Sequence, residues 1–298
     1  MIPVIITADD FGLAEELNEA VEIAHRCGVL SAASLMVGAP AAQDALRRAR
    51  RLPKLRVGLH LVLVDGDPIL SQKLIPRLLG STGRLREDLV RLAFELLGSR
   101  RSRVQMRAEI DAQFDSFRRS GLRLDHVSVH KHYHLHPMVG REVTAACQRF
   151  GSPPLRVPGE PTSVIRLADP GASLLPSAAF SGWSRILRAQ ARCAGLMVPD
   201  AVFGLAWSGR FTTTRLLRLL QHLPSGIVEI YHHPATVDQF VGSAAGYEYS
   251  KELAALCAPD VLAEVRRRQI EPVGYSDCLY DAAWGCNSGA VRLPPRPS

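Results

Sequence analysis

Half of the ten histidines in this 298-residue chain lie within one stretch, residues 126–136. A second group with chemical potential, Asp9 and Asp10, follows directly after an apolar run at residues 4–8. Imidazole and carboxylate groups together are the ligands that divalent metals of intermediate hardness prefer. The two stretches therefore indicate a metal-assisted hydrolase.

The histidine stretch places histidine at most of its even-numbered positions, in the middle of the chain, which is unlike a polyhistidine tag. If residues 126–136 form a strand, these positions share one face, which would extend about 33 Å at about 3.3 Å per residue. Because a metal–ligand bond is about 2 Å long, one ion can contact only one or two of these histidines. The others are left for substrate contacts, support of the metal ligands, or packing.

The composition fits an ordinary globular protein, with 47% hydrophobic and 22% charged residues. A formal net charge of +7 would suit an anionic partner. However, the arginines are spread over expected helix faces, such as residues 47–51 and 266–268, without interleaved aromatic residues. This pattern argues against a nucleic-acid partner, whereas peripheral contact with a membrane stays open.

The first residues lack the basic segment and apolar core of a signal peptide, and no uncharged run has the length of a membrane span. The six cysteines are widely spaced without a C-x-x-C pair, which is typical of free thiols in a reducing compartment. The expected location is therefore the cytoplasm, either free or at the periphery of the inner membrane.

Short apolar runs alternate with amphipathic stretches along the chain. Strands are expected at residues 4–8, 34–37, 55–63, 126–130, 155–157, 202–205, 226–231 and 272–275. Helices are expected near residues 14–27, 41–51, 86–98 and 103–119, and long loops near residues 64–85 and 158–181. The alternation predicts an α/β fold, a closed or nearly closed β/α barrel of about seven parallel strands. We expect one domain over residues 1–281 and a disordered tail at residues 282–298.

Polar side chains fall at the ends of several expected strands, where parallel α/β folds bind their ligands. These are Asp9 and Asp10, His60, His130 and His132, Arg156, and His232 with His233. Each feature also has an ordinary structural explanation. Two adjacent aspartates often form a turn or cap a helix, and a single histidine such as His60 is more often part of a core. The convergence of carboxylates, imidazoles and a guanidinium on one rim favours a catalytic site.

The same residues resemble the YdjC-like carbohydrate deacetylases, which include chitooligosaccharide deacetylases and the deacetylases associated with hopanoid biosynthesis. The motifs that carry the resemblance are Ala8-Asp9-Asp10-Phe11-Gly12, Gly58-Leu59-His60, the run from His126 through His130 and His132 to His134, and His233-Pro234-Ala235. Residues 33–37 and the Leu52-Pro53 pair are most similar to the hopanoid-associated branch. The resemblance extends over roughly residues 2–280.

The resemblance implies a β/α-barrel-like fold with a bound divalent ion, in a family whose members are often homodimers. Its implied metal ligands are Asp10, His60 and His130, its implied base is Asp9, and its implied acid, which protonates the leaving nitrogen, is His233. Arg156 is implied to orient the base carboxylate or to touch substrate, and His132 to lie near the sugar or behind the metal ligands. A neighbouring carboxylate would be needed to keep His233 protonated at neutral pH.

The function expected from the residues and the resemblance is metal-dependent hydrolysis of a linear amide C–N bond, which removes acetyl from an N-acetylated amino sugar. A hopanoid-linked N-acetylglucosamine is one such substrate, and a lipid-linked substrate would bring the enzyme to a membrane. Zinc is the first choice of ion, because three protein ligands plus water suit it, while magnesium, manganese, cobalt and iron also accept this ligand set. Two alternatives stay open. One is another metal-dependent hydrolase on the same barrel, acting on a phosphoester or another amide, and the other is a non-catalytic His-rich metal-binding protein.

Overall fold

The computed structural model describes residues 1–279, without the side chains of residues 176, 177 and 179. Its strands are β1 (Ile2–Phe11), β2 (Ala32–Leu35), β3 (Arg56–Leu61), β4 (Val127–Val129), β5 (Ala201–Phe203), β6 (Val228–His232) and β7 (Ile270–Val273). Its helices are α1 (Glu15–Cys27), α2 (Ala42–Arg50), α3 (Leu89–Gly98), α4 (Arg100–Arg119), the 3₁₀ helix η1 (His130–Leu135), α5 (Pro137–Arg149), α6 (Thr162–Ala168), α7 (Leu175–Cys193), α8 (Thr213–Gln221), α9 (Tyr249–Cys257) and α10 (Pro259–Arg267). The tail predicted at residues 282–298 lies outside the described residues.

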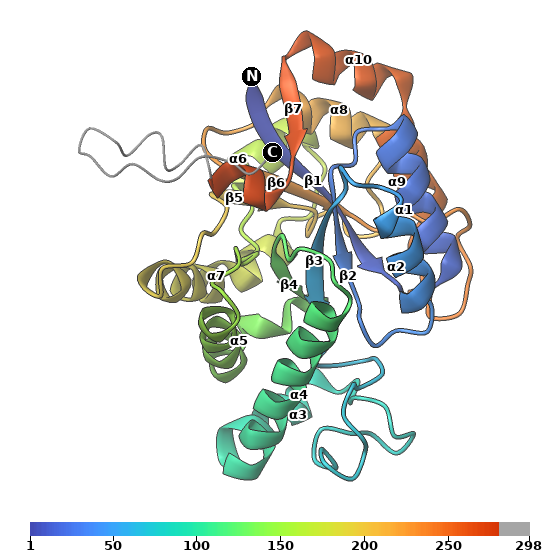
Figure 1. Ribbon diagram of the computed structural model, residues 1–298. Helices are drawn as coiled ribbons and strands as arrows, with labels where there is room; N and C mark the ends of the chain where they lie inside the picture. The colour runs from blue at the N-terminus through green and yellow to red at the C-terminus, as the bar shows by residue number, and fades with distance from the viewer. Residues whose placement is uncertain (280–298) are drawn as a thin grey trace, which may run out of the picture.

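The sheet is an open half-barrel. All pairings between the named strands are parallel, in the order β4-β3-β2-β1-β6-β5, and β7 also pairs with β1. Val4 pairs with both β6 and β7, so these two strands lie on opposite sides of β1. Helices α1, α2 and α9 cover one flank of the sheet (Figure 1). The predicted closed or nearly closed barrel is wrong, because β4 and β5 end the sheet without pairing to each other in the described part of the chain.

A proline-rich segment accounts for the opening. The strand predicted at residues 155–157 is replaced by single bridges, in which Leu155 pairs with Val127 of β4 and Gly159 pairs with Val202 of β5. Prolines stand at positions 153, 154, 158 and 161, and a proline has no N–H to donate to a strand ladder. The segment therefore fills the space between the two edge strands but cannot join them into a continuous sheet.

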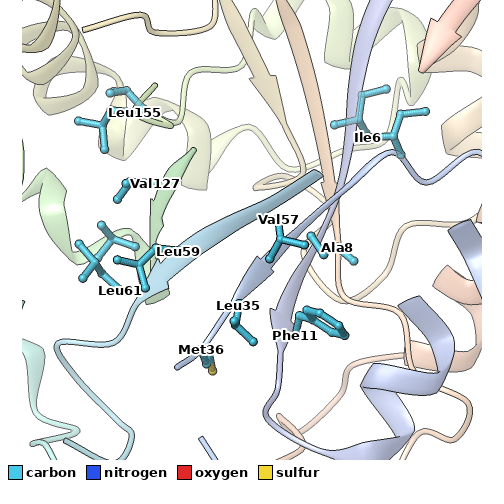
Figure 2. Close-up of a cluster of buried hydrophobic side chains, with 14 of the residues drawn as sticks. Ile6, Ala8, Phe11, Leu35, Met36, Val57, Leu59, Leu61, Val127 and Leu155 are labelled. Carbon is cyan, nitrogen blue, oxygen red and sulfur yellow. The ribbon is translucent and has the colours of Figure 1, made fainter. Parts of the chain in front are cut away.

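Alternation along β1 separates an outer apolar layer from the interior of the half-barrel. The fully buried residues of the main core include Val4, Ile6 and Ala8 of this strand; Figure 2 shows part of this core. Ile5 belongs to a separate cluster with Tyr275. Because successive side chains of a strand point to opposite faces, Thr7 and Asp9 share the interior face with Ile5. This face therefore changes from apolar to polar toward the carboxyl end of β1.

The histidine stretch leaves the sheet early. Strand β4 covers only three residues, and His130 begins η1, in which Lys131 and His132 have φ angles of 53° and 51°. The chain must turn here because α5 begins at Pro137. The prediction of a strand with all even-numbered positions on one face is therefore wrong beyond β4.

The helices predicted near residues 41–51, 86–98 and 103–119 are confirmed as α2, α3 and α4. The loop predicted at residues 158–181 instead contains α6 and the beginning of α7. No helix among residues 1–279 is long and apolar enough to cross a membrane.

Candidate metal and acid–base site

Strand β1 carries two consecutive aspartates that line one cavity. The pairing register between β1 and β2 shifts between Ala8 and Phe11, and Asp10 has a φ angle of 59°. A β-bulge of this kind re-aims a side chain, and aspartate tolerates the left-handed backbone better than most residues. Asp9 keeps the interior direction of its strand, and the bulge turns Asp10 toward the same cavity.

Asp10, His60 and His130 form a cluster in which the ligand atoms all lie within 4.8 Å of one another. Asp10 Oδ1 is 3.3 Å from His60 Nε2 and 3.2 Å from His130 Nδ1. This buried oxygen has no hydrogen-bond partner among residues 1–279. Ser128 Oγ lies 2.7 Å from His60 Nδ1, which leaves Nε2 for the cluster. Three convergent donors, one of them an unpaired buried carboxylate oxygen, fit a divalent metal ion.

Asp9 is held by Arg156, whose Nη1 donates to Asp9 Oδ2. The guanidinium is completely buried, with Cζ 4.9 Å from the centroid of the Tyr231 ring. Asp9 Oδ1 has no hydrogen-bond partner in the described part of the chain. Burial raises the pKa of Asp9, but Arg156 and nearby histidines lower it more, so the net shift is downward. Arg156 therefore orients the Asp9 carboxylate.

His233 follows β6 and lines the same cavity. Its backbone N–H donates to Glu252 Oε2, which anchors the loop after the strand. Burial lowers the pKa of His233, and the carboxylates of Asp10 and Asp9 raise it by less, so the net shift is downward. The neighbouring carboxylates required by the sequence prediction are therefore present, but burial outweighs them.

The other histidines of the 126–136 stretch divide between the cavity and the interior. His132 lines the cavity, with Nε2 3.0 Å from Tyr231 Oη, and burial holds the pKa of His132 well below its usual value. His126 is fully buried, 2.9 Å from Asp125 Oδ2, and His134 is bonded to a backbone carbonyl oxygen. Of the histidines in this stretch, only His130 and His132 line the cavity that contains the two aspartates.

The cavity has a volume of about 570 Å³. Its aromatic wall residues include Phe180, Tyr231, Tyr247 and Tyr249. Its charged lining includes two ion pairs, Lys131 with Asp65 and Arg84 with Asp67. A cavity of this size, with aromatic walls and a few convergent polar groups, is typical of a small-molecule site.

Sequence reasoning missed Glu229, Tyr231 and Glu252. Glu229 is fully buried in β6 and accepts from Arg156, and Glu252 of α9 holds the loop of His233. Glu229 had a signal in the sequence, because it interrupts an otherwise apolar run and a buried acid requires partners. Glu252 had no comparable signal, since acidic residues are common in helices.

Comparisons with known proteins agree over nearly the whole chain. The sequence model of the family described as YdjC-like protein matches residues 3–267. The chain is 29% identical over 276 residues to a carbohydrate deacetylase from Geobacillus stearothermophilus, covering 92% of this chain and 96% of that protein. It is 27% identical over 296 residues to a carbohydrate deacetylase from Vibrio vulnificus, covering 95% and 99% of the two chains. A crystal structure from Enterococcus faecalis, of a protein with a proposed role in cellobiose-phosphate cleavage, shares the fold, with a TM-score of 0.74, 24% identity and coverage of 93% and 98%. The chain therefore belongs to the YdjC-like protein family.

Proposed function

We propose that this protein is a metal-dependent N-deacetylase that removes acetyl from an N-acetylated amino sugar. The observation that carries the proposal is that Asp9, the Asp10–His60–His130 cluster and His233 all line one cavity. The carbohydrate deacetylases from Geobacillus and Vibrio support the class of substrate.

Asp10, His60 and His130 would hold the ion. When bound, a divalent ion supplies Lewis-acid polarisation of the amide carbonyl and activation of water. Zinc suits a site with three protein ligands, and magnesium, manganese or cobalt would also accept the Asp/His/His set.

Asp9 would act as the base. Arg156 occupies its Oδ2 and favours its ionised form, while the unpaired Oδ1 is free to accept a proton from the attacking water. His233 would donate a proton to the leaving nitrogen, a contribution typically worth about 10²- to 10⁴-fold in rate. Asp9 and Asp10 favour its protonated form, and burial opposes it.

The finer form of the proposal is a lipid-linked amino sugar, such as a hopanoid-linked N-acetylglucosamine, processed in the cytoplasm at the inner membrane. An apolar helix face beside the cavity supports this choice. Phe180 of α7 lines the cavity, and Trp183 and Ile186 of the same helix are each 49% exposed. Exposed aromatic and aliphatic side chains on an amphipathic helix are typical of contact with a lipid surface. If the protein does not sediment with anionic liposomes, membrane contact is removed from the proposal. A molecular mass from light scattering would decide separately whether the chain forms the homodimer implied by the family.

The function is tested by metal content from elemental analysis, followed by acetate release from a panel of N-acetyl amino sugars with and without a chelator. We expect about one tightly bound ion per chain and acetate release that is lost on chelation. Activity on phosphate esters without acetate release would contradict the proposal. Several weakly bound ions, together with no effect of His233→Ala on any turnover, would favour a metal-binding protein instead.

A further inference from the structure

A column of buried polar side chains runs through the half-barrel beneath the cavity. Arg156 donates to Asp9 on one side and to Glu229 of β6 on the other. Tyr275, which follows β7, donates its hydroxyl to Glu229. All four residues are at most 2% exposed. The roles proposed above use Asp9 and Arg156, and they leave Glu229 and Tyr275 without one.

The acceptor positions of Glu229 are fully used. Its Oε1 accepts from Arg156 Nη2 at 2.6 Å and from Thr7 Oγ1 at 2.7 Å. Its Oε2 accepts from Arg156 Nε at 2.9 Å and from the Tyr275 hydroxyl. A carboxylate offers about four lone-pair positions, so this one is saturated. The two bonds to Nε and Nη2 fix the plane of the guanidinium and leave Nη1 for Asp9.

Two carboxylates share one guanidinium in this column, so the ionised column carries a net charge of −1. A buried charge without an opposite partner is unfavourable unless hydrogen-bond donors surround it. Thr7 and Tyr275 are the additional donors to Glu229. Burial and the charge of Glu229 raise the pKa of Tyr275 well above its usual value, so the hydroxyl keeps the proton that it donates.

The segment after β7 holds Tyr275 in place. The backbone N–H groups of Tyr275 and Ser276 donate to Asp125 at 3.1 and 2.9 Å, and Asp277 pairs with Arg56 at 2.8 Å. Arg56 begins β3 and Asp125 precedes β4. The segment, which follows β7 in Figure 1, therefore closes the amino-terminal end of the half-barrel, opposite the cavity.

We propose that Tyr275 is a positioning residue, whose hydroxyl holds Glu229 so that Glu229 can hold Arg156. Through Arg156, the hydroxyl sets the orientation of the Asp9 carboxylate. This inference rests on the function proposed above. The family match ends at residue 267, so Tyr275 lies outside the part of the chain that the match covers. The segment that closes the amino-terminal end of the half-barrel thereby controls the orientation of the Asp9 carboxylate at the opposite end.

The variant Tyr275→Phe tests the inference, because phenylalanine retains the ring that stacks on His126 with centroids 4.5 Å apart and loses only the hydroxyl. We expect kcat for acetate release to fall by about 5- to 50-fold while KM stays within about twofold, since the variant changes no cavity-lining residue. The matched control is Tyr133→Phe, which removes a partly buried hydroxyl that donates to the Leu89 carbonyl outside the column. Its kcat should stay within about twofold of wild type. A Tyr275→Phe variant that behaves like this control, or that changes only KM, overturns the inference.

A double-mutant cycle with Glu229→Gln distinguishes positioning from a general loss of structure. If the hydroxyl acts through Glu229, the kcat of the double variant should lie within about twofold of the kcat of Glu229→Gln alone. A double variant that shows the full losses of both single variants overturns the inference. Should Tyr275→Phe fail to fold, Glu229→Gln alone decides, since an unchanged kcat in that variant would remove the link to Arg156. A wild-type protein that releases no acetate from any N-acetyl amino sugar refutes the proposed function, while an active wild type with unaffected variants refutes only this inference.

Discussion

The variant Asp9→Asn separates the base from the metal ligands. Asparagine has nearly the same size and can still accept from Arg156 Nη1 through its carbonyl oxygen. The atom that replaces Oδ1 is an amide nitrogen, which cannot accept a proton from water. Asp10, His60 and His130 are unchanged, so the ligand cluster should retain its ion.

The expected magnitudes follow from the charges in the buried column. Asp9→Asn replaces an ionised carboxylate, whose pKa lies below its usual value, with a neutral amide, so the free energy of unfolding should fall by about 1–3 kcal/mol. Arg156→Met is the contrasting variant, because it leaves two buried carboxylates without a cation and should destabilise the fold by about 3–5 kcal/mol. Loss of the base in Asp9→Asn should lower kcat by about 10²- to 10⁴-fold, which corresponds to about 3–5 kcal/mol of activation free energy.

The assay combines acetate release at saturating substrate, elemental analysis and thermal unfolding on the same preparation. Asp10→Asn is the matched control, since it alters the neighbouring carboxylate in the ligand cluster and should lose the ion. Loss of the ion from Asp9→Asn would refute the division of roles between the two aspartates. A kcat within about tenfold of wild type would show that another group takes the proton.

The remaining predictions concern groups behind the site. Ser128→Ala removes the partner of His60 Nδ1 and should weaken metal affinity by about 10- to 100-fold, measured by competition with a chelating dye; unchanged affinity would exclude the orienting role. Burial raises the pKa of Asp125, but hydrogen bonds to its carboxylate lower it more, to about 2. The ionised carboxylate therefore stabilises the fold above its usual pKa of 3.8, and this stability is lost as pH falls toward 2. Denaturant unfolding of Asp125→Asn should therefore show a deficit of about 2 kcal/mol at pH 6 that shrinks at pH 2–3, and a deficit independent of pH would contradict this. Burial raises the pKa of Glu252 from 4.5 to about 8, although backbone N–H donors lower it in part. The wild type should therefore lose stability relative to Glu252→Gln as pH rises from 5 to 8. Unfolding free energies of the two proteins that follow the same pH dependence would argue against this.

The position of the candidate metal cluster could be predicted from the sequence because its residues belong to the ends of parallel strands. Asp10 lies in β1, His60 in β3 and His130 directly after β4, and consecutive parallel strands bring their carboxyl ends to one rim. Local residue types and strand periodicity were sufficient to bring these side chains to one rim, whereas the choice of Asp10, His60 and His130 as the ligands came from the resemblance to the YdjC-like family. The fold class and most strands could be predicted for the same reason.

Closure of the sheet could not be predicted, because it depends on a few backbone N–H groups in one segment. Apolar alternation at residues 155–157 indicated a strand, yet the flanking prolines leave too few donors for a ladder. The pairing of Arg156 with Glu229 could not be predicted from the sequence either. Glu229 is 73 residues away in the chain, and pairing a buried arginine with a particular acid requires the position of the segment that lies between β4 and β5.

The different roles proposed for Asp9 and Asp10 depend on the bulge in β1. In a regular strand, Asp10 would share the outward face of Ala8 and point into the apolar layer beneath the helices. The left-handed backbone that turns it inward costs about 1 kcal/mol or more for a residue with a Cβ, and such strain persists where the surrounding contacts fix it. The sequence contains a hint in Gly12, which also has a positive φ, of 100°, but turn-forming residues after a strand are common. Two adjacent aspartates therefore predict the place of the chemistry, and the backbone at Asp10 is the feature that would allow one carboxylate to bind an ion while its neighbour remains free to take a proton.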